Sequence, residues 1–175
     1  MAQATESTFL DAEGQGMTVS DLAERFGPIP LARIRFNPFP GTATEQDVVE
    51  IREREDRLYE LVDGVLVEKA MGAYESYLAM LLGRLLGNHV ADGKSGVILG
   101  ADGMMRLMPG LIRIPDLSFI ARERLPGGRV PRTPMAERAP DLAVEVISKG
   151  NAPREMSQKL KEYFAAGARG LAHLF

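Results

Sequence analysis

The chain has 175 residues, of which 45% are hydrophobic and 26% charged, and this composition favours one globular domain and excludes intrinsic disorder and fibrous repeats. Because there is no cysteine, disulfide scaffolds, thiolate catalysis and cysteine-ligated zinc are excluded. The net charge of −3 excludes a global positive field, so any contact with nucleic acid has to use a local basic patch.

Neither a membrane span nor a secretion signal is expected. The apolar stretches end after a few residues, far short of the roughly 20 residues that cross a bilayer. The N-terminal segment MAQATESTFLDAEG has no basic region followed by an apolar one. We therefore expect a cytoplasmic protein.

Residues 1–42 are predicted to form an N-terminal arm. They are rich in Gly, Pro and small polar residues. One short helical window, Ser20–Phe26, has Thr18 or Ser20 as its possible cap.

Residues 43–175 are predicted to form the main domain. It begins with a charged surface helix that starts near Thr44 and ends before Leu58. The segments LYELV and VLVEK follow, separated by Asp63-Gly64. A two-residue Asp-Gly turn between short apolar runs predicts a β-hairpin.

Residues 73–90 are predicted to form the main core helix. The apolar residues of this segment follow the spacing of a helix with one buried face. They are Tyr77, Leu78, Leu81, Leu82, Leu85, Leu86 and Val90.

The second half of the chain alternates strand-like runs with loops. The runs GVILG, GMMRLM and LIRIPDLSFIA are followed by a polar loop and a fourth run, DLAVEVI. A turn at residues 148–153 leads into a last helix through Phe164. This order predicts an α/β fold with a mixed β-sheet flanked by helices.

Two of these strand-like runs each carry an acidic residue in an apolar setting. Alternation along LIRIPDLSFIA places Asp116 on a face with three isoleucines, and alternation along DLAVEVI places Glu145 beside Ala143 and Ile147. A carboxylate removed from water needs a cation, a hydrogen-bond donor or a raised pKa. A metal ion would satisfy both acids.

Glu60 is a third candidate ligand, because it lies on the predicted hairpin at the same parity as Leu58 and Val62. Mg²⁺ prefers carboxylate oxygens and keeps several waters, so three acids match its donors without His or Cys. Metal-assisted phosphodiester cleavage also benefits from a cation near the reacting phosphate. Lys159 is the candidate cation.

Lys159 is predicted to lie beside the buried stripe of the last helix, while Lys161 and Glu162 point away from it. The predicted stripe consists of Met156, Leu160, Tyr163 and Phe164.

Each of these residues also has a structural alternative. Asp116 follows Pro115 and could be a turn or strand-end residue. Glu145 could form an internal ion pair with Arg113, and Glu60 could likewise be structural. Lys159 could extend along the core with only its ammonium in water.

In combination and in this order, several motifs resemble the Uma-two family, a restriction-endonuclease-like branch of the PD-(D/E)XK nuclease superfamily, over most of the chain. The motifs are YELVDG at 59–64, RIPD at 113–116, APDLAVEVIS at 139–148, and Lys159 followed by Tyr163 and Gly167.

The resemblance implies a restriction-endonuclease-like core, dependence on Mg²⁺ or Mn²⁺, and hydrolysis of DNA phosphodiester bonds. Asp116 would be the first motif acid and Glu145 the second. The superfamily pattern expects a lysine two residues after the second acid, where this sequence has Ile147. In similar proteins the next helix supplies this lysine, and Lys159 matches that position.

The resemblance also raises an expectation for the C-terminus. Members of the family usually continue past the lysine helix into a strand with a Trp, whereas this chain ends with GLAHLF. We expect an altered or truncated C-terminus that exposes a sheet edge and apolar surface, which predicts weak stability, dimerisation or aggregation. DNA and a second copy of the chain are therefore the expected partners.

Two functional hypotheses follow. The first is a metal-dependent DNA endonuclease that uses Asp116, Glu145, Glu60 and Lys159. The second is a catalytically inactive nuclease-fold module that binds DNA or another protein. The second is motivated by Ile147, by the acidic net charge and by the abrupt C-terminus.

Overall fold

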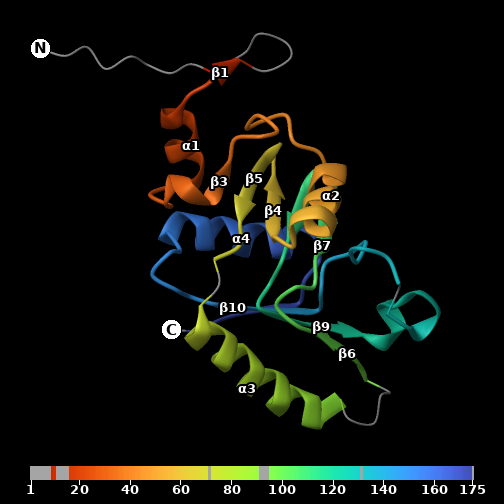
Figure 1. Ribbon diagram of the computed structural model, residues 1–175. Coiled ribbons are helices and arrows are strands. Elements are labelled where there is room, and N and C mark those ends of the chain that lie inside the picture. The colour runs from red at the N-terminus through yellow and green to blue at the C-terminus, as the bar shows by residue number, and fades with distance from the viewer. Residues whose placement is uncertain (1–8, 11–15, 71, 91–94, 131, 175) are drawn as a thin grey trace, which may run out of the picture.

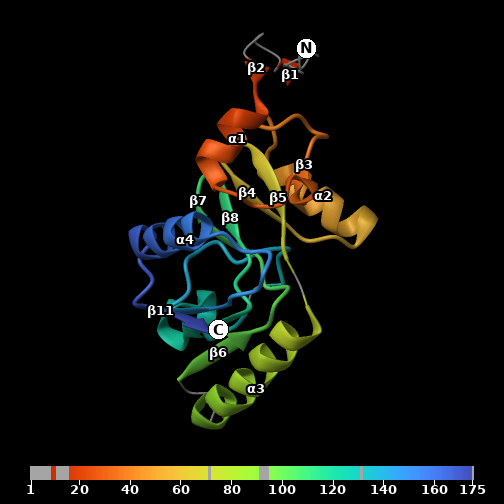
Figure 2. The same ribbon diagram turned by 90° about the vertical axis from the view of Figure 1, so that its left-hand side faces the viewer.

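A computed structural model describes residues 9–10, 16–70, 72–90, 95–130 and 132–174. Two larger β-sheets form the body of the molecule, and helix α4 (Pro153–Ala165) lies between them in both views (Figure 1 and Figure 2). Helices also cover the outer faces. None of the described helices is long and apolar enough to cross a membrane.

One larger sheet has five strands in the order β3-β5-β4-β8-β7, and each pair of neighbours is antiparallel. Its strands are β3 (Ile34–Arg35), β4 (Tyr59–Val62), β5 (Val65–Glu68), β7 (Met105–Met108) and β8 (Leu111–Arg113).

The other larger sheet has four strands in the order β11-β10-β9-β6. It is mixed, because β10 and β11 are parallel while the other neighbours are antiparallel. Its strands are β6 (Gly96–Leu99), β9 (Leu117–Ala121), β10 (Leu142–Val146) and β11 (Gly170–Leu174). This confirms the predicted α/β fold with a mixed sheet flanked by helices. A small separate pair consists of β1 (Phe9–Leu10) and β2 (Gly16–Met17).

The first two helices begin at threonine caps. Helix α1 (Val19–Phe26) follows Thr18 and helix α2 (Glu45–Glu55) follows Thr44, and each threonine forms a capping box with the aspartate three residues later. Both predicted helices are confirmed. The predicted boundary at residue 42 stays a prediction, although Leu22 of α1 is buried in the core.

The predicted hairpin is also confirmed. Strands β4 and β5 pair from Tyr59 with Glu68 to Val62 with Val65. The turn residues Asp63 and Gly64 have φ angles of 48° and 76°, as expected for a tight hairpin turn with two positive-φ residues.

Alternation along β4 and β5 decides what the two faces of the five-stranded sheet contact. One face carries Tyr59, Leu61 and Leu66 toward α2. The other carries Val62, Val65 and Val67 into the core between the two sheets. Glu60 has the parity of Val62, so its side chain enters this inner core, where it is 1% exposed.

The run LIRIPDLSFIA does not form one continuous strand. Ile114, Pro115 and Asp116 separate β8 from β9, and these two strands belong to different sheets. The predicted shared face for Asp116 and the isoleucines is therefore wrong. Pro115 has no backbone N–H for a ladder, and the chain changes sheets at this point.

Helix α3 (Ala73–Val90) has the predicted bounds, but it is not the main core helix. Among its described residues only Ala79 is fully buried, and Gly83 lies directly over Leu117. Small residues therefore let the helix approach the four-stranded sheet from outside (Figure 1). Large apolar residues face away from the sheet: Tyr74, Tyr77, Met80, Leu81 and Leu85.

Gly64 provides a test of the hairpin turn. A Cβ at Gly64 would lie 2.3 Å from the carbonyl oxygen of Gly41, whereas one at Gly110, which has the same φ of 76°, would meet nothing within 4 Å. We expect Gly110→Ala to lower the free energy of unfolding by about 1 kcal/mol through backbone strain alone. Gly64→Ala should cost a further 1–3 kcal/mol, roughly, because of the added clash. Equal losses in urea denaturation would contradict this packing.

Candidate active site

Three elements bring Lys159 and two acids together. Glu60 comes from β4, Glu145 from β10 and Lys159 from α4. The Lys159 Nζ atom lies 3.0 Å from Glu60 Oε1 and 3.2 Å from both carboxylate oxygens of Glu145. Tyr163, one helical turn later, donates its hydroxyl to Glu145 Oε1 at 3.0 Å. The lysine is thus shared by carboxylates from two different sheets.

Glu60 also accepts hydrogen bonds from Arg113 and from the backbone of Ile114. Arg113 Nη1 donates to Glu60 Oε2 at 2.8 Å, and the backbone N–H of Ile114 donates to Oε1 at 3.1 Å. Arg113 also donates from Nε to Glu162 Oε2 at 2.7 Å. Both oxygens of Glu60 therefore have buried partners.

Asp116 approaches Glu145 from the segment between β8 and β9. Its backbone N–H donates to the Val144 carbonyl at 3.0 Å, and its Oδ2 accepts the N–H of Val146 at 2.7 Å. Its Oδ1 lies 2.9 Å from the Nζ atom of Lys69. Since Val144 and Val146 flank Glu145, these bonds fix Asp116 beside the second acid.

Asp116 and Glu145 share a small pocket of about 10 Å³, which is about the space of one water molecule. Its lining residues are Arg33, Lys69, Ala70, Asp116, Glu145, Val146, Asn151 and Lys159. Three of the predicted site residues therefore line one pocket, and Glu60 contacts it through Lys159.

The surroundings shift the pKa values of Glu60 and Glu145 in opposite directions. Burial alone would raise the pKa of Glu60, but the charges of Lys159 and Arg113 and the N–H of Ile114 outweigh burial and lower the pKa to about 2. For Glu145, burial dominates over the charge of Lys159, so its pKa is raised. Two carboxylates that share one lysine thus differ in their affinity for a proton.

Lys159 stays charged despite its burial. Burial lowers the pKa of a lysine, but the charges of Glu145 and Glu60 outweigh this effect and raise the pKa of Lys159 above its usual range. Its side chain is only 5% exposed. The ammonium is therefore a permanent positive charge next to the pocket.

Several expectations for the last helix and for Arg113 are wrong. Arg113 pairs with Glu60 and Glu162, so the alternative in which it pairs with Glu145 is not what the structure has. Glu162 points into the interior and not away from it, while Leu160 and Phe164 are 39% and 48% exposed. Met156 and Tyr163 of the predicted stripe are buried, and the charged residues Lys159 and Glu162 share the buried face with them.

Sequence reasoning also missed Lys69. It follows directly on β5, where one lysine after a glutamate has the pattern of an ordinary exposed strand end. In the fold its side chain is 4% exposed and pairs with Asp116. Only the fold brings the two together, because the Lys69 side chain reaches the segment after β8, where it also donates to the Ile114 carbonyl.

Asp116 and Glu145 are the carboxylates of the pocket that could hold a divalent cation. In the part of the chain that the structure describes, no group of three or more His, Asp or Glu residues could hold a metal ion. Asp116 and Glu145 still supply hard carboxylate oxygens to one pocket, and Mg²⁺ is often held by one or two carboxylates with water completing its shell. The chemistry of this pair fits such an ion.

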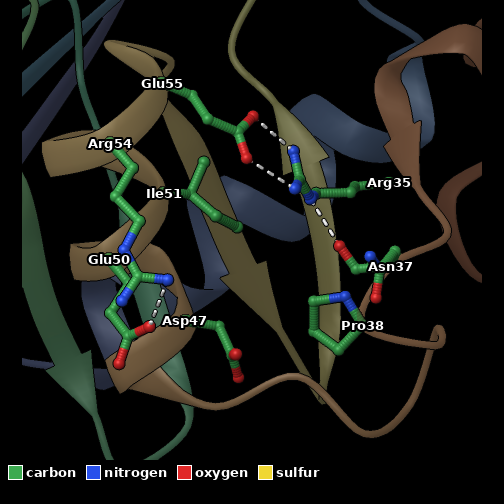
Figure 3. A pocket seen from close by; sticks show the side chains of 8 residues that line it. All are labelled: Arg35, Asn37, Pro38, Asp47, Glu50, Ile51, Arg54 and Glu55. Atoms are coloured by element: carbon green, nitrogen blue, oxygen red, sulfur yellow. Dashed lines mark hydrogen bonds and ion pairs between the residues drawn. The ribbon is translucent and has the colours of Figure 1, made fainter.

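A separate surface pocket of about 180 Å³ lies between α2 and the segment that follows β3 (Figure 3). Four of its charged residues form two ion pairs, Arg35 with Glu55 and Arg54 with Glu50, and the fifth, Asp47, accepts from Thr44. None of the predicted site residues lines this pocket.

The lowered pKa of Glu60 makes a prediction for stability in acid. Because its pKa is lower in the folded protein than the ordinary value of 4.5, its stabilising effect is complete above that value and is lost as the pH falls toward 2. We expect the free energy of unfolding to fall less between about pH 5 and pH 3 in Glu60→Gln than in the wild type. Exposed Glu53→Gln should keep the wild-type slope. Equal slopes for all three proteins in denaturant titrations would contradict the assignment.

The chain was compared with known proteins. Residues 45–171 match Uma2, a family described as "putative restriction endonuclease". Among curated proteins none matches. A solved structure from Anabaena variabilis, described as "a putative nuclease belonging to DUF820", is similar with a TM-score of 0.58 and 15% identity over 67% of each chain. This likeness shows a shared fold. Because the family match spans more than half of the sequence and includes Glu60, Asp116, Glu145 and Lys159, the chain belongs to the Uma2 family.

Proposed function

We propose that the protein is a metal-dependent DNA endonuclease that hydrolyses phosphodiester bonds at the pocket between Asp116 and Glu145. The observation that carries the proposal is that these two acids line one pocket with Lys159. The description of the family, "putative restriction endonuclease", supports the same class of reaction.

Asp116 and Glu145 are the proposed ligands of Mg²⁺ or Mn²⁺. When bound, such an ion lowers the pKa of a coordinated water and offsets negative charge on a phosphate. Glu60 stays a predicted ligand, but its contacts favour a different role. Since Arg113 and Ile114 hold Glu60 in place, Glu60 would position the ammonium of Lys159.

Lys159 is proposed to act on the phosphate. Its charge is maintained by two carboxylates, and it lies at the wall of the pocket. A fixed positive charge in a site with little water stabilises negative charge that develops in a transition state. Arg33 and Lys69 add two more cations to the same pocket, which supports a polyanionic substrate such as DNA.

A specific observation also supports the inactive module as a second candidate. Ile147 replaces the expected lysine, and the oxygens of Asp116, Glu145 and Glu60 already accept from protein donors. A site held by its own ion pairs is stable without a metal. Binding of DNA without any cleavage would favour this candidate.

Plasmid nicking tests the proposed activity. We expect cleavage with Mg²⁺ or Mn²⁺ and none with a chelator. Asp116→Ala and Glu145→Gln should each reduce the rate about a hundredfold or more, because each removes a charge at the reacting centre. Asp141→Asn is the matched control: Asp141 also follows a proline and is buried, but it does not line the pocket. If Asp116→Ala is folded, as shown by thermal melting, and still cleaves DNA at the wild-type rate, the proposal is contradicted.

We also propose that the protein forms a homodimer through α3. The exposed residues Tyr74, Tyr77, Leu81 and Leu85 recur at helical spacing and form one outward stripe, between 39% and 64% exposed. A patch of this kind marks an interaction site more often than a free surface. If two copies of α3 pack antiparallel about a two-fold axis at Leu81, Tyr77 lies opposite Leu85 of the partner subunit, so that the two apolar stripes cover each other.

The dimer can be tested by sedimentation velocity. Leu81→Glu should convert the protein into a monomer at micromolar concentration, because two glutamates would face each other across the axis. Leu160→Glu on α4 is the control, since Leu160 has the same exposed fraction of 39%. A monomeric wild type, or a dimer that Leu81→Glu leaves intact, would contradict the proposal.

A further inference from the structure

We infer that Lys69 is a second cation of the site and that it competes with a divalent metal ion for Asp116. This inference rests on the proposed function, because it concerns the same pocket. It assigns a role to Lys69, a residue outside the predicted set, whose ammonium is the ion-pair partner of Asp116.

Hydrogen bonds from both its backbone and its side chain hold Lys69 in place beside Asp116. Its backbone N–H donates to the carbonyl of Leu58, the residue before β4, at 3.0 Å, which extends the pairing of the hairpin by one residue. Its Nζ atom donates to the Ile114 carbonyl at 2.5 Å and lies 2.9 Å from Asp116 Oδ1. The side chain is 4% exposed, so these contacts replace its hydration.

The two oxygens of Asp116 have different partners. Oδ2 accepts the backbone N–H of Val146, a bond that belongs to the fold. Oδ1 has the ammonium of Lys69. The oxygen that is held only by a side chain is therefore the one from which a metal ion could displace its partner.

Lys69 and Glu145 line the same pocket as Asp116, and Lys159 neutralises Glu145 there. Each of the two acids that line the pocket thus has a lysine partner, and Lys159 also pairs with Glu60. A divalent ion at Asp116 would lie within a few ångströms of the Lys69 ammonium, and like charges at that separation repel strongly in a buried site. Binding of the ion therefore requires the Lys69 ammonium to move away from Asp116 Oδ1, or weakens the ion pair between them.

A titration with Mn²⁺ alone, followed by calorimetry, tests the inference. We expect Lys69→Met to bind Mn²⁺ about tenfold tighter than the wild type, because the competing charge is gone. Lys69→Gln, which keeps a donor for the Ile114 carbonyl, should show the same gain if Lys69→Met folds poorly. Lys161→Met, which changes an exposed lysine on the same helix as Lys159, should match the wild type.

The gain must also depend on Asp116. Adding Asp116→Asn to Lys69→Met should abolish the tighter binding. Folded Lys69 variants that bind Mn²⁺ no more tightly than the wild type, or do not bind it at all, would overturn the inference.

The outcome is separable from that of the proposed function. Tighter Mn²⁺ binding by the Lys69 variants without DNA cleavage by any of the proteins would support the competition and contradict the endonuclease. Cleavage that depends on Asp116, together with unchanged Mn²⁺ affinity in the Lys69 variants, would support the endonuclease and overturn the competition.

Discussion

The ammonium of Lys159 is shared by two carboxylates that belong to different sheets, Glu60 on β4 and Glu145 on β10. Helix α4 carries the lysine between the sheets, so this ionic contact joins the three layers of the fold. Arg113 and Glu162 extend it by a second buried pair. Buried ion pairs of this kind contribute little net stability, but removal of one partner leaves an uncompensated charge in the interior. The network therefore determines the relative position of the layers more than it adds to the free energy of unfolding.

The same network explains the character of the candidate site. Burial would neutralise each charged group alone, and their arrangement keeps Lys159 and Glu60 charged while the pKa of Glu145 is raised. Groups with opposed pKa shifts around one pocket are typical of functional sites, although structural ion pairs also produce them. The pocket holds the two acids whose oxygens suit a hard cation, and the lysines beside it suit a phosphate.

Local sequence signals predicted the local structure well. Threonine caps, the Asp63-Gly64 turn and the bounds of α3 depend on neighbouring residues, and all were predictable. The buried face of α3 was not predictable from the sequence. The helix approaches the sheet through Ala79 and Gly83, while its larger apolar residues face outward. Periodicity reports that a helix is amphipathic, not which partner it meets.

The site was predictable only in part. Strand alternation, helical position and the family motifs all point to Asp116, Glu145 and Lys159, and the structure brings these residues to one pocket. The ion pairs around them join residues that are far apart in the sequence, Lys69 with Asp116 and Arg113 with Glu60 and Glu162, so no spacing indicates these pairs. Two Pro-Asp pairs occur in the chain, and the fold gives their aspartates different surroundings: Asp116 lines the pocket, whereas Asp141 accepts the N–H of Ala121.

A crystal structure with Mn²⁺, located by its anomalous scattering, tests the central claim most directly. The account predicts one peak between the carboxylates of Asp116 and Glu145, with Lys159 still in contact with Glu60 and with Lys69 moved away from Asp116. A peak bound by Glu60, with Lys159 displaced, would contradict it. So would a well-ordered protein in saturating Mn²⁺ with no peak in this pocket.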